Sequence, residues 1–189
     1  MARLIKTTAL EWPAEAGWLV PPPSPEANCT ALQYAVILRA MKDVGILEVP
    51  LGSNRGVRIE RYLRRANVPE SLIRTGKGWW CAAEVGAVFL DCGIPVPADY
   101  ASVDSWLPYL AQTRTIGSAV VYGVRGDGHH IGIIARLSPM VLTIEGNRGF
   151  AGTTNNGVAC DIGPMQRKDN LGYISPEALI RAWERQGAA

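Results

Sequence analysis

The sequence has few of the features that mark a metal-binding, membrane or nucleic-acid-binding protein. Its 189 residues include two histidines and four cysteines, and the cysteines fit no zinc-binding spacing. No stretch approaches the roughly 20 consecutive apolar residues that span a bilayer. The formal net charge is only +2, which argues against a dedicated nucleic-acid or membrane-surface protein. We therefore expect no metal, no cofactor, no nucleic-acid partner and no membrane insertion.

The N-terminal residues also lack the apolar core of a signal peptide, so we expect a protein that is made in the cytoplasm. With 48% hydrophobic and 19% charged residues, the chain can bury one substantial core. We expect residues 1–28, with their proline run VPPPSPE, to form an N-terminal arm, and residues 29–189 to form a single domain. A domain of this size needs no disulfides, so the cysteines are expected to be free thiols: Cys29, Cys81, Cys92 and Cys160.

Helical periodicity dominates the first half of the chain. It predicts one helix over Ala27–Val44 and a second that starts from Ser53 as N-cap and stops before Pro69. A third helix begins at or near Cys81 and ends at Gly93, and we expect it to be amphipathic. Arginines crowd the second helix, and we interpret them as a solvated face: Arg55, Arg58, Arg61, Arg64 and Arg65.

After Gly93 the pattern changes to short runs of branched residues separated by Gly, Asp and Pro, which is typical of neighbouring strands. The runs lie at 117–124, 131–137, 140–146 and 158–162, and RLSPMV is short enough for a hairpin turn. A last helix is predicted from the cap Ser175 to Gly187, with Pro176 in its first position. Helices followed by an antiparallel sheet indicate an α+β fold.

Cys81 raises the question of chemistry, because a nucleophilic thiol needs a base to hold it as thiolate. The two histidines are adjacent, His129 and His130, in GDGHHIGII. Strand alternation puts the two histidines on opposite faces of the strand. Gly132 leaves room beside His130, so His130 is favoured as the base that acts on Cys81. Each residue taken alone is equally explained as core packing or as the end of a strand.

The next predicted strand carries Glu145 and Asn147, two residues apart and able to face the same side. Either side chain could accept the imidazole Nδ1 hydrogen and aim the other ring nitrogen at sulfur. Glu145 is favoured over Asp127, which falls in a turn.

Five segments in this order resemble the CHAP family of cysteine, histidine-dependent amidohydrolases and peptidases of bacteria and phages. They are NRGVRIERYL, GWWCAAEV, GSAVVYG, GHHIGII and TIEGN, and the resemblance covers roughly residues 48–165. It implies a papain-like fold with Cys81 as nucleophile, His130 as general base, Glu145 as the residue that orients the imidazole, and Asn147 as an alternative or additional orienting residue. Asn54, Arg55, Trp79 and Trp80 are the candidates for substrate contacts.

The activity implied by the resemblance is hydrolysis of amide bonds in peptidoglycan, by an endopeptidase or an N-acetylmuramoyl-L-alanine amidase. Action on the cell wall would follow holin release, transport on a phage tail or virion, or secretion. Two alternatives stay open: a non-catalytic virion or baseplate docking subunit, and an effector amidase that acts on protein. Glu84 departs from the family, which usually has an aromatic there, and suggests more polar surroundings for that side of the helix.

Overall fold

The computed structural model describes residues 29–124, 128–148, 159–165 and 170–187. Its helices are α1 (Ala31–Met41), α2 (Val57–Arg65), α3 (Glu70–Arg74), α4 (Cys81–Asp91), the 3-10 helix η1 (Val103–Tyr109) and α5 (Pro176–Gly187). The strands are β1 (Ala119–Val124), β2 (Gly128–Arg136), β3 (Leu142–Arg148), β4 (Ala159–Pro164) and β5 (Asn170–Ile174). They form one sheet in the order β4-β3-β2-β1-β5, and every neighbouring pair is antiparallel. The predicted α+β class is confirmed, whereas the predicted N-terminal arm lies outside the described residues.

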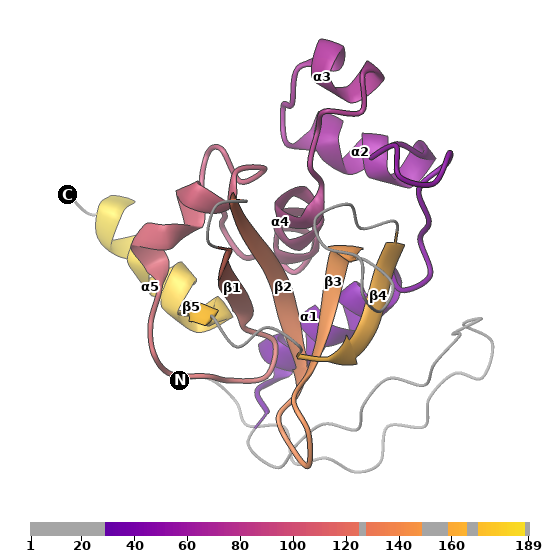
Figure 1. The fold of residues 1–189 in the computed structure, drawn as a ribbon. Helices are drawn as coiled ribbons and strands as arrows, with labels where there is room; N and C mark the ends of the chain where they lie inside the picture. Colours follow the sequence, from indigo (N-terminus) through magenta and orange to yellow (C-terminus); the bar gives the residue numbers. More distant parts are fainter. Residues whose placement is uncertain (1–28, 125–127, 149–158, 166–169, 188–189) are drawn as a thin grey trace.

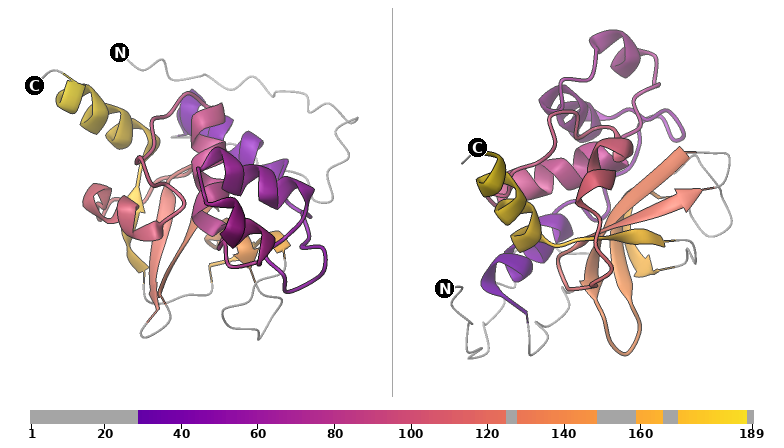
Figure 2. Two further views of the ribbon diagram at one scale, coloured as in Figure 1. Left: turned by 90° about the horizontal axis from the view of Figure 1, so that it is seen from above. Right: turned by 90° about the vertical axis from the view of Figure 1, so that its left-hand side faces the viewer.

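Helices α1 and α4 cover one face of the sheet, and α2 and α3 extend beyond one end of it (Figures 1 and 2). The main core lies between the sheet and α4, and it joins Val85 and Phe89 of the helix to Val121, Ile131 and Ile133 of the strands. A smaller apolar cluster occupies the other face, around Tyr122 and Ile134. The sheet therefore has one face packed by helices, and that face receives the N-terminus of α4.

Helices α1 and α2 begin later than the sequence predicts. Thr30 and Gln33 form a capping box, in which the Thr30 hydroxyl accepts from the Gln33 N–H and the Gln33 side chain accepts from the Thr30 N–H. This cap sets the start of α1 at Ala31. Ser53 is not a cap, because its hydroxyl donates to the Pro50 carbonyl within a turn. Helix α2 instead starts after Gly56, whose φ of 141° suits glycine.

Helix α4 begins at Cys81 and is followed by Gly93 at φ 73°, as predicted. It is not amphipathic, because every residue from Cys81 to Phe89 is buried. The sheet covers one side of the helix, and α1 and α2 cover the others. Gly86 lies so close to the Tyr100 ring that a Cβ there would come within 2.0 Å of it. The tight cover explains how residues 81–89, with Glu84 among them, are all buried, while Asp91 at the end of the helix is exposed.

The four predicted strands and the RLSPMV turn are confirmed as β1 to β4 and the β2–β3 connection. Three short elements escape the pattern: α3, η1 and β5. Strand β5 pairs with β1 through Val120↔Tyr173, but its own sequence contains Gly172 at φ 155° and offers little periodicity. It joins the sheet because β1 presents an open edge, which is a property of the fold rather than of the segment.

Strands β2 and β3 separate toward the end that carries the histidines. Their recorded pairs run from Arg136↔Leu142 to Ile133↔Ile144, whereas β2 continues to pair with β1 as far as Val124↔Gly128. Figure 1 shows the two strands diverging in front of α4. The gap between them leaves backbone groups of β2 free of the ladder at the level of Ile131.

All four cysteines lie in the described part of the chain, and none forms a disulfide, as expected. The arginines of α2 do not form a simple solvated face. Arg58 donates to the buried Asp43 at 2.7 Å, Arg64 to Glu60 and Glu70 at 3.0 Å, and Arg65 to Asp91 at 2.6 Å. Among the described residues, no helix combines the length and apolar character needed to cross a bilayer.

Candidate active site

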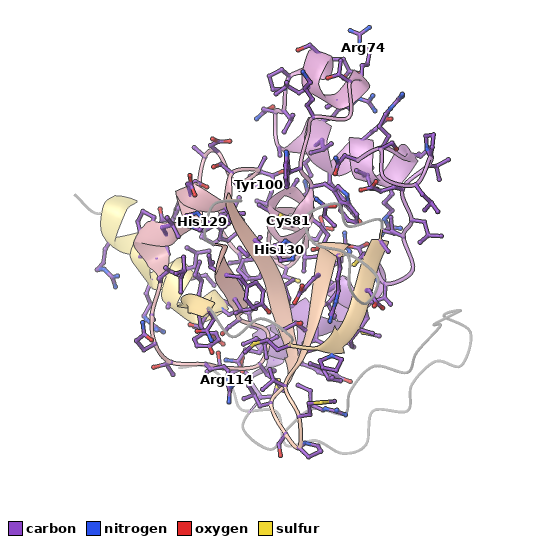
Figure 3. All side chains as sticks on the ribbon, in the orientation of Figure 1. Arg74, Cys81, Tyr100, Arg114, His129 and His130 are labelled. Carbon is purple, nitrogen blue, oxygen red and sulfur yellow. The ribbon has the colours of Figure 1, made fainter. Side chains whose placement is uncertain are left out.

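Cys81 is the first residue of α4 and lies against the gap between β2 and β3 (Figure 3). Its sulfur accepts hydrogen bonds from the backbone N–H groups of Ala82 and Ile131 and interacts with the His130 side chain. The Ile131 N–H is available because β2 has left β3 at this level. No side chain caps the start of α4, so the uncompensated N–H groups of its first turn surround the thiol.

His130 is buried on β2 and faces the Cys81 sulfur. Its ring stacks on Tyr122, its direct partner on β1, with the centroids 5.9 Å apart and the planes at 25°. Its Nε2 lies 3.1 Å from Glu145 Oε2. Because Nε2 contacts the carboxylate, Nδ1 is the ring nitrogen left to interact with the Cys81 sulfur. The sequence predicted the reverse arrangement, with Nδ1 on the acid and Nε2 on the sulfur.

Glu145 is held by three groups. Its Oε1 accepts from the Tyr122 hydroxyl at 3.0 Å and from the Thr143 hydroxyl at 2.6 Å, while Oε2 meets His130. Gly132 makes the room, because a Cβ at that position would lie 2.4 Å from Glu145 Cγ. Tyr122 and Thr143 were not among the site residues predicted from the sequence. Strand register could have suggested them, since Tyr122 stands opposite His130 and Thr143 precedes Glu145 by two residues.

Opposite charges stabilise one another across these three residues. Burial raises the pKa of the Cys81 thiol, but the charge and hydrogen bond of His130 and the two backbone N–H groups outweigh it, so the pKa falls below its usual 9.0. Burial lowers the pKa of His130, yet the Cys81 thiolate and then Glu145 raise it to about 9. Burial raises the pKa of Glu145, but the hydrogen bond and charge of His130, the charge of Arg148 and the hydrogen bond from Thr143 bring this pKa down to about 2. The arrangement favours a thiolate, an imidazolium and a carboxylate.

Asn147 does not join this chain of contacts. Its backbone is left-handed, with φ 56°, and the β3–β4 register shifts between Glu145 and Arg148. This break in alternation separates Asn147 from Glu145, although the two were expected to face the same side. Its buried Oδ1 has no hydrogen-bond partner within the described ranges. The orienting contact on His130 comes from Glu145.

Residues 76–80 lead into Cys81 and are braced by a buried carboxylate. Glu48 Oε1 accepts from Trp80 Nε1 at 2.9 Å, and Glu48 Oε2 accepts from the Asn54 N–H at 2.8 Å. The Asn54 side chain then donates to the Gly76 carbonyl at 3.0 Å. Trp80 is fully buried. Trp80 and Asn54, predicted to touch substrate, therefore support the segment before Cys81, and Glu48 was not among the predicted residues.

Arg55 is also placed away from Cys81. Its Nε donates to Glu60 at 3.1 Å on α2, and it is absent from the groove that reaches the thiol. Because Arg55 pairs with Glu60 and does not line the groove, the structure does not support its predicted contact with substrate.

An open groove of about 490 Å³ reaches Cys81. One side comes from the α2–α3 connection and residues 77–79, and another from residues 99–104 with His129. Trp79, half exposed, lines it as predicted for at least one of the two tryptophans. His129 Nδ1 meets the Asp104 carboxylate at the rim. His129 therefore lines the groove and pairs with Asp104, whereas His130 is the histidine that contacts the Cys81 thiol.

Glu84, one turn beyond Cys81, is fully buried, and neither of its side-chain oxygens has a hydrogen-bond partner among the described residues. A Cβ on Gly146 would touch both Trp80 and Glu84, so the site is tightly packed, and the charges of Asp43, Arg39, Cys81 and His130 act on the Glu84 carboxyl group. The more polar surroundings expected for this position consist of these nearby ionisable groups, none of which hydrogen-bonds the Glu84 side chain. Burial, followed by the nearby charge of Asp43, raises the pKa of Glu84 well above its usual value.

Within the described residues, no group of three or more His, Cys, Asp or Glu side chains is placed to bind a metal ion. Asp127, the less favoured candidate for the acid beside His130, lies outside the described residues. No family model, curated protein or solved structure matches the chain.

Proposed function

We propose that this chain is a thiol hydrolase that cleaves amide bonds in bacterial peptidoglycan, with a papain-like arrangement of its reacting groups. The observation that carries the proposal is the contact series from the Cys81 sulfur through His130 to Glu145 at the start of a buried helix. A groove that opens onto that sulfur gives a substrate access. The resemblance of the surrounding segments to the CHAP family supplies the substrate class.

The reaction follows from the charges of the three residues. The Cys81 thiolate attacks the carbonyl carbon, a C–S bond forms, and the electron pair moves to the carbonyl oxygen. The backbone N–H of Cys81, at the uncapped start of α4, stabilises that oxyanion. The His130 imidazolium gives its proton to the amine nitrogen as the C–N bond breaks. Water then attacks the thioester, passes a proton to His130, and the Cys81 sulfur leaves as thiolate.

The proposed setting is phage-associated degradation of the cell wall, with the enzyme released by a holin or carried by tail or virion proteins. The groove suits an extended peptide, because it is open along its length and has Trp79 as an aromatic wall. Either an endopeptidase or an N-acetylmuramoyl-L-alanine amidase would use the same residues.

Digestion of purified peptidoglycan by the wild type and by Cys81→Ala, with mass spectrometry of the fragments, tests the proposal. The wild type should release soluble fragments whose termini identify the bond, and Cys81→Ala should release none. Cys92→Ala is the matched control, because Cys92 caps the other end of the same helix and should be dispensable.

Equal release by wild type and Cys81→Ala would exclude Cys81 as nucleophile. Release by neither would favour the non-catalytic docking subunit. An intact wall together with deamidated protein side chains would favour the effector amidase.

A further inference from the structure

The groove carries two kinds of polar group on separate segments. Residues 99–104 contribute the exposed carboxylates Asp99 and Asp104, and residues 77–79 contribute Lys77. Asp104 is engaged with His129. Among the groove-lining residues that the structure describes, Lys77 is the one lysine or arginine.

We infer that Lys77 binds a carboxylate of the peptide that occupies this groove. The inference rests on the proposed function only in taking the groove as the substrate site. A carboxylate is repelled from the segment with Asp99 and Asp104 and attracted to Lys77, so the charges also give the peptide a preferred placement.

Lys77 is available for this contact, unlike four of the arginines on or next to α2. Arg55, Arg58, Arg64 and Arg65 all pair with carboxylates of the protein. Within the described ranges Lys77 makes no ion pair, and its side chain is exposed in the groove. A cation that the fold does not neutralise is the one a ligand carboxylate can reach without displacing a partner.

The backbone that carries Lys77 is held firmly. Its N–H donates to the Leu72 carbonyl at 2.9 Å. On one side is Gly76, with φ 67°, where a Cβ would lie 2.3 Å from the Ser53 carbonyl oxygen. On the other is Gly78, where a Cβ would lie 3.0 Å from Leu63. Since Asn54 also donates to the Gly76 carbonyl, the segment cannot swing freely, and Lys77 is presented from a fixed point.

The reach of Lys77 limits where the carboxylate can be. Lys77 precedes Cys81 by four residues in an extended segment, which spans at most about 14 Å. A substrate in extended conformation advances about 3.3 Å per residue. The backbone of Lys77 therefore lies within a distance that about four extended substrate residues cover from the bond that Cys81 attacks, and the carboxylate lies within the additional reach of the lysine side chain.

Binding of soluble stem peptides to the Cys81→Ala protein, measured by calorimetry, tests the contact without turnover. Peptides released from purified peptidoglycan are used with their carboxylates free and after chemical conversion to amides. Amidation should weaken binding about tenfold. Lys77→Met in the same background should weaken binding of the free peptide about tenfold and leave the amidated peptide unchanged. Lys77→Arg should retain the preference.

Arg55→Met is the matched control, because it removes an exposed cation outside the groove and should leave both affinities unchanged. The inference is overturned if Lys77→Met still prefers the free peptide by the original factor, or if no carboxylate-dependent binding occurs. Hydrolysis of the same peptides by the wild type is scored separately. Lys77-dependent binding without hydrolysis would retain the inference and reject the enzyme, and hydrolysis without Lys77 dependence would do the reverse.

Discussion

At the scale of single residues, Glu145 connects the reacting groups to the sheet. It accepts from Tyr122 and Thr143 through one oxygen and meets His130 through the other. These contacts fix the ring of His130, stabilise its charge and leave Nδ1 directed at Cys81. A carboxylate in this place does more than an amide, because only a carboxylate compensates an imidazolium in a buried site.

Glu145→Gln should therefore change the pH dependence as well as the rate. Glu145 helps to raise the pKa of His130 to about 9, so its loss lowers that pKa toward 6.5. The imidazolium that protonates the leaving amine is then lost at lower pH. Profiles of kcat/KM against pH should show the alkaline limb, near pH 9 in the wild type, displaced downward, and the rate at pH 8 reduced at least about tenfold.

Tyr122→Phe is the control for this change, because it removes one hydrogen bond to Glu145 and keeps the carboxylate. It should lower the rate less and leave the alkaline limb near its original position. An unchanged limb in Glu145→Gln would show that the carboxylate does not tune His130.

At the scale of elements, residues 81–89 of α4 are all buried, and they include Glu84 in the first turn. The acid faces Asp43, Arg39, Cys81 and His130 without forming a hydrogen bond to any described residue. A raised pKa means that the folded protein retains a proton that the unfolded chain loses above pH 4.5. The free energy of unfolding is therefore penalised increasingly as pH rises from 4.5 toward the folded pKa.

Glu84→Gln removes this penalty. It should increase the free energy of unfolding, with a gain near zero at pH 4.5 that grows by up to about 1.4 kcal/mol per pH unit above it. Urea unfolding of both proteins at pH 4.5, 6 and 8 measures the gain. Glu184→Gln, exposed on α5, is the control and should show little difference at any pH. A gain that does not vary with pH would contradict the burial of an ionisable Glu84.

At the scale of the whole molecule, the first and last described helices are tied together by one carboxylate. The Thr30 hydroxyl donates to Glu177 Oε1 at 2.7 Å, and Gln33 Nε2 donates to Oε2 at 3.3 Å. Both donors also form the cap of α1. The link between Thr30 and Glu177 joins residues that are 147 positions apart in the chain.

Glu177→Ala should lower the free energy of unfolding by about 1 kcal/mol, since it removes two partly buried hydrogen bonds. It should leave kcat unchanged, because neither partner contacts Cys81, His130 or Glu145. Thermal unfolding and peptidoglycan digestion measure the two effects. Glu184→Ala is the matched control on the same helix, and a loss of activity in Glu177→Ala would show that α5 affects the groove.

Local signals in the sequence were enough to predict most elements and to predict which histidine and which acid lie beside Cys81. Ser175 does cap α5, by accepting from the Ala178 N–H at 3.0 Å, and Gly93 does follow α4 in a left-handed conformation. The favoured base, His130, and acid, Glu145, do lie together beside Cys81. These features depend on short sequence intervals, on strand alternation and on the scarcity of histidine, all of which can be read without the fold.

Contacts between distant segments were decided only by the tertiary structure. Cover from α1, α2 and the sheet, and not the sequence pattern of α4 itself, buries residues 81–89 of this helix, Glu84 among them. The register shift in β3 removed Asn147 from the site. Hydrogen bonds to Glu48 fix Trp80 and Asn54 as supports of the segment before Cys81. The packing of the helices places Lys77, and none of the arginines, among the described residues that line the groove. Residue type and spacing cannot specify which of several possible partners a side chain meets, because that choice is made when elements far apart in the chain pack together.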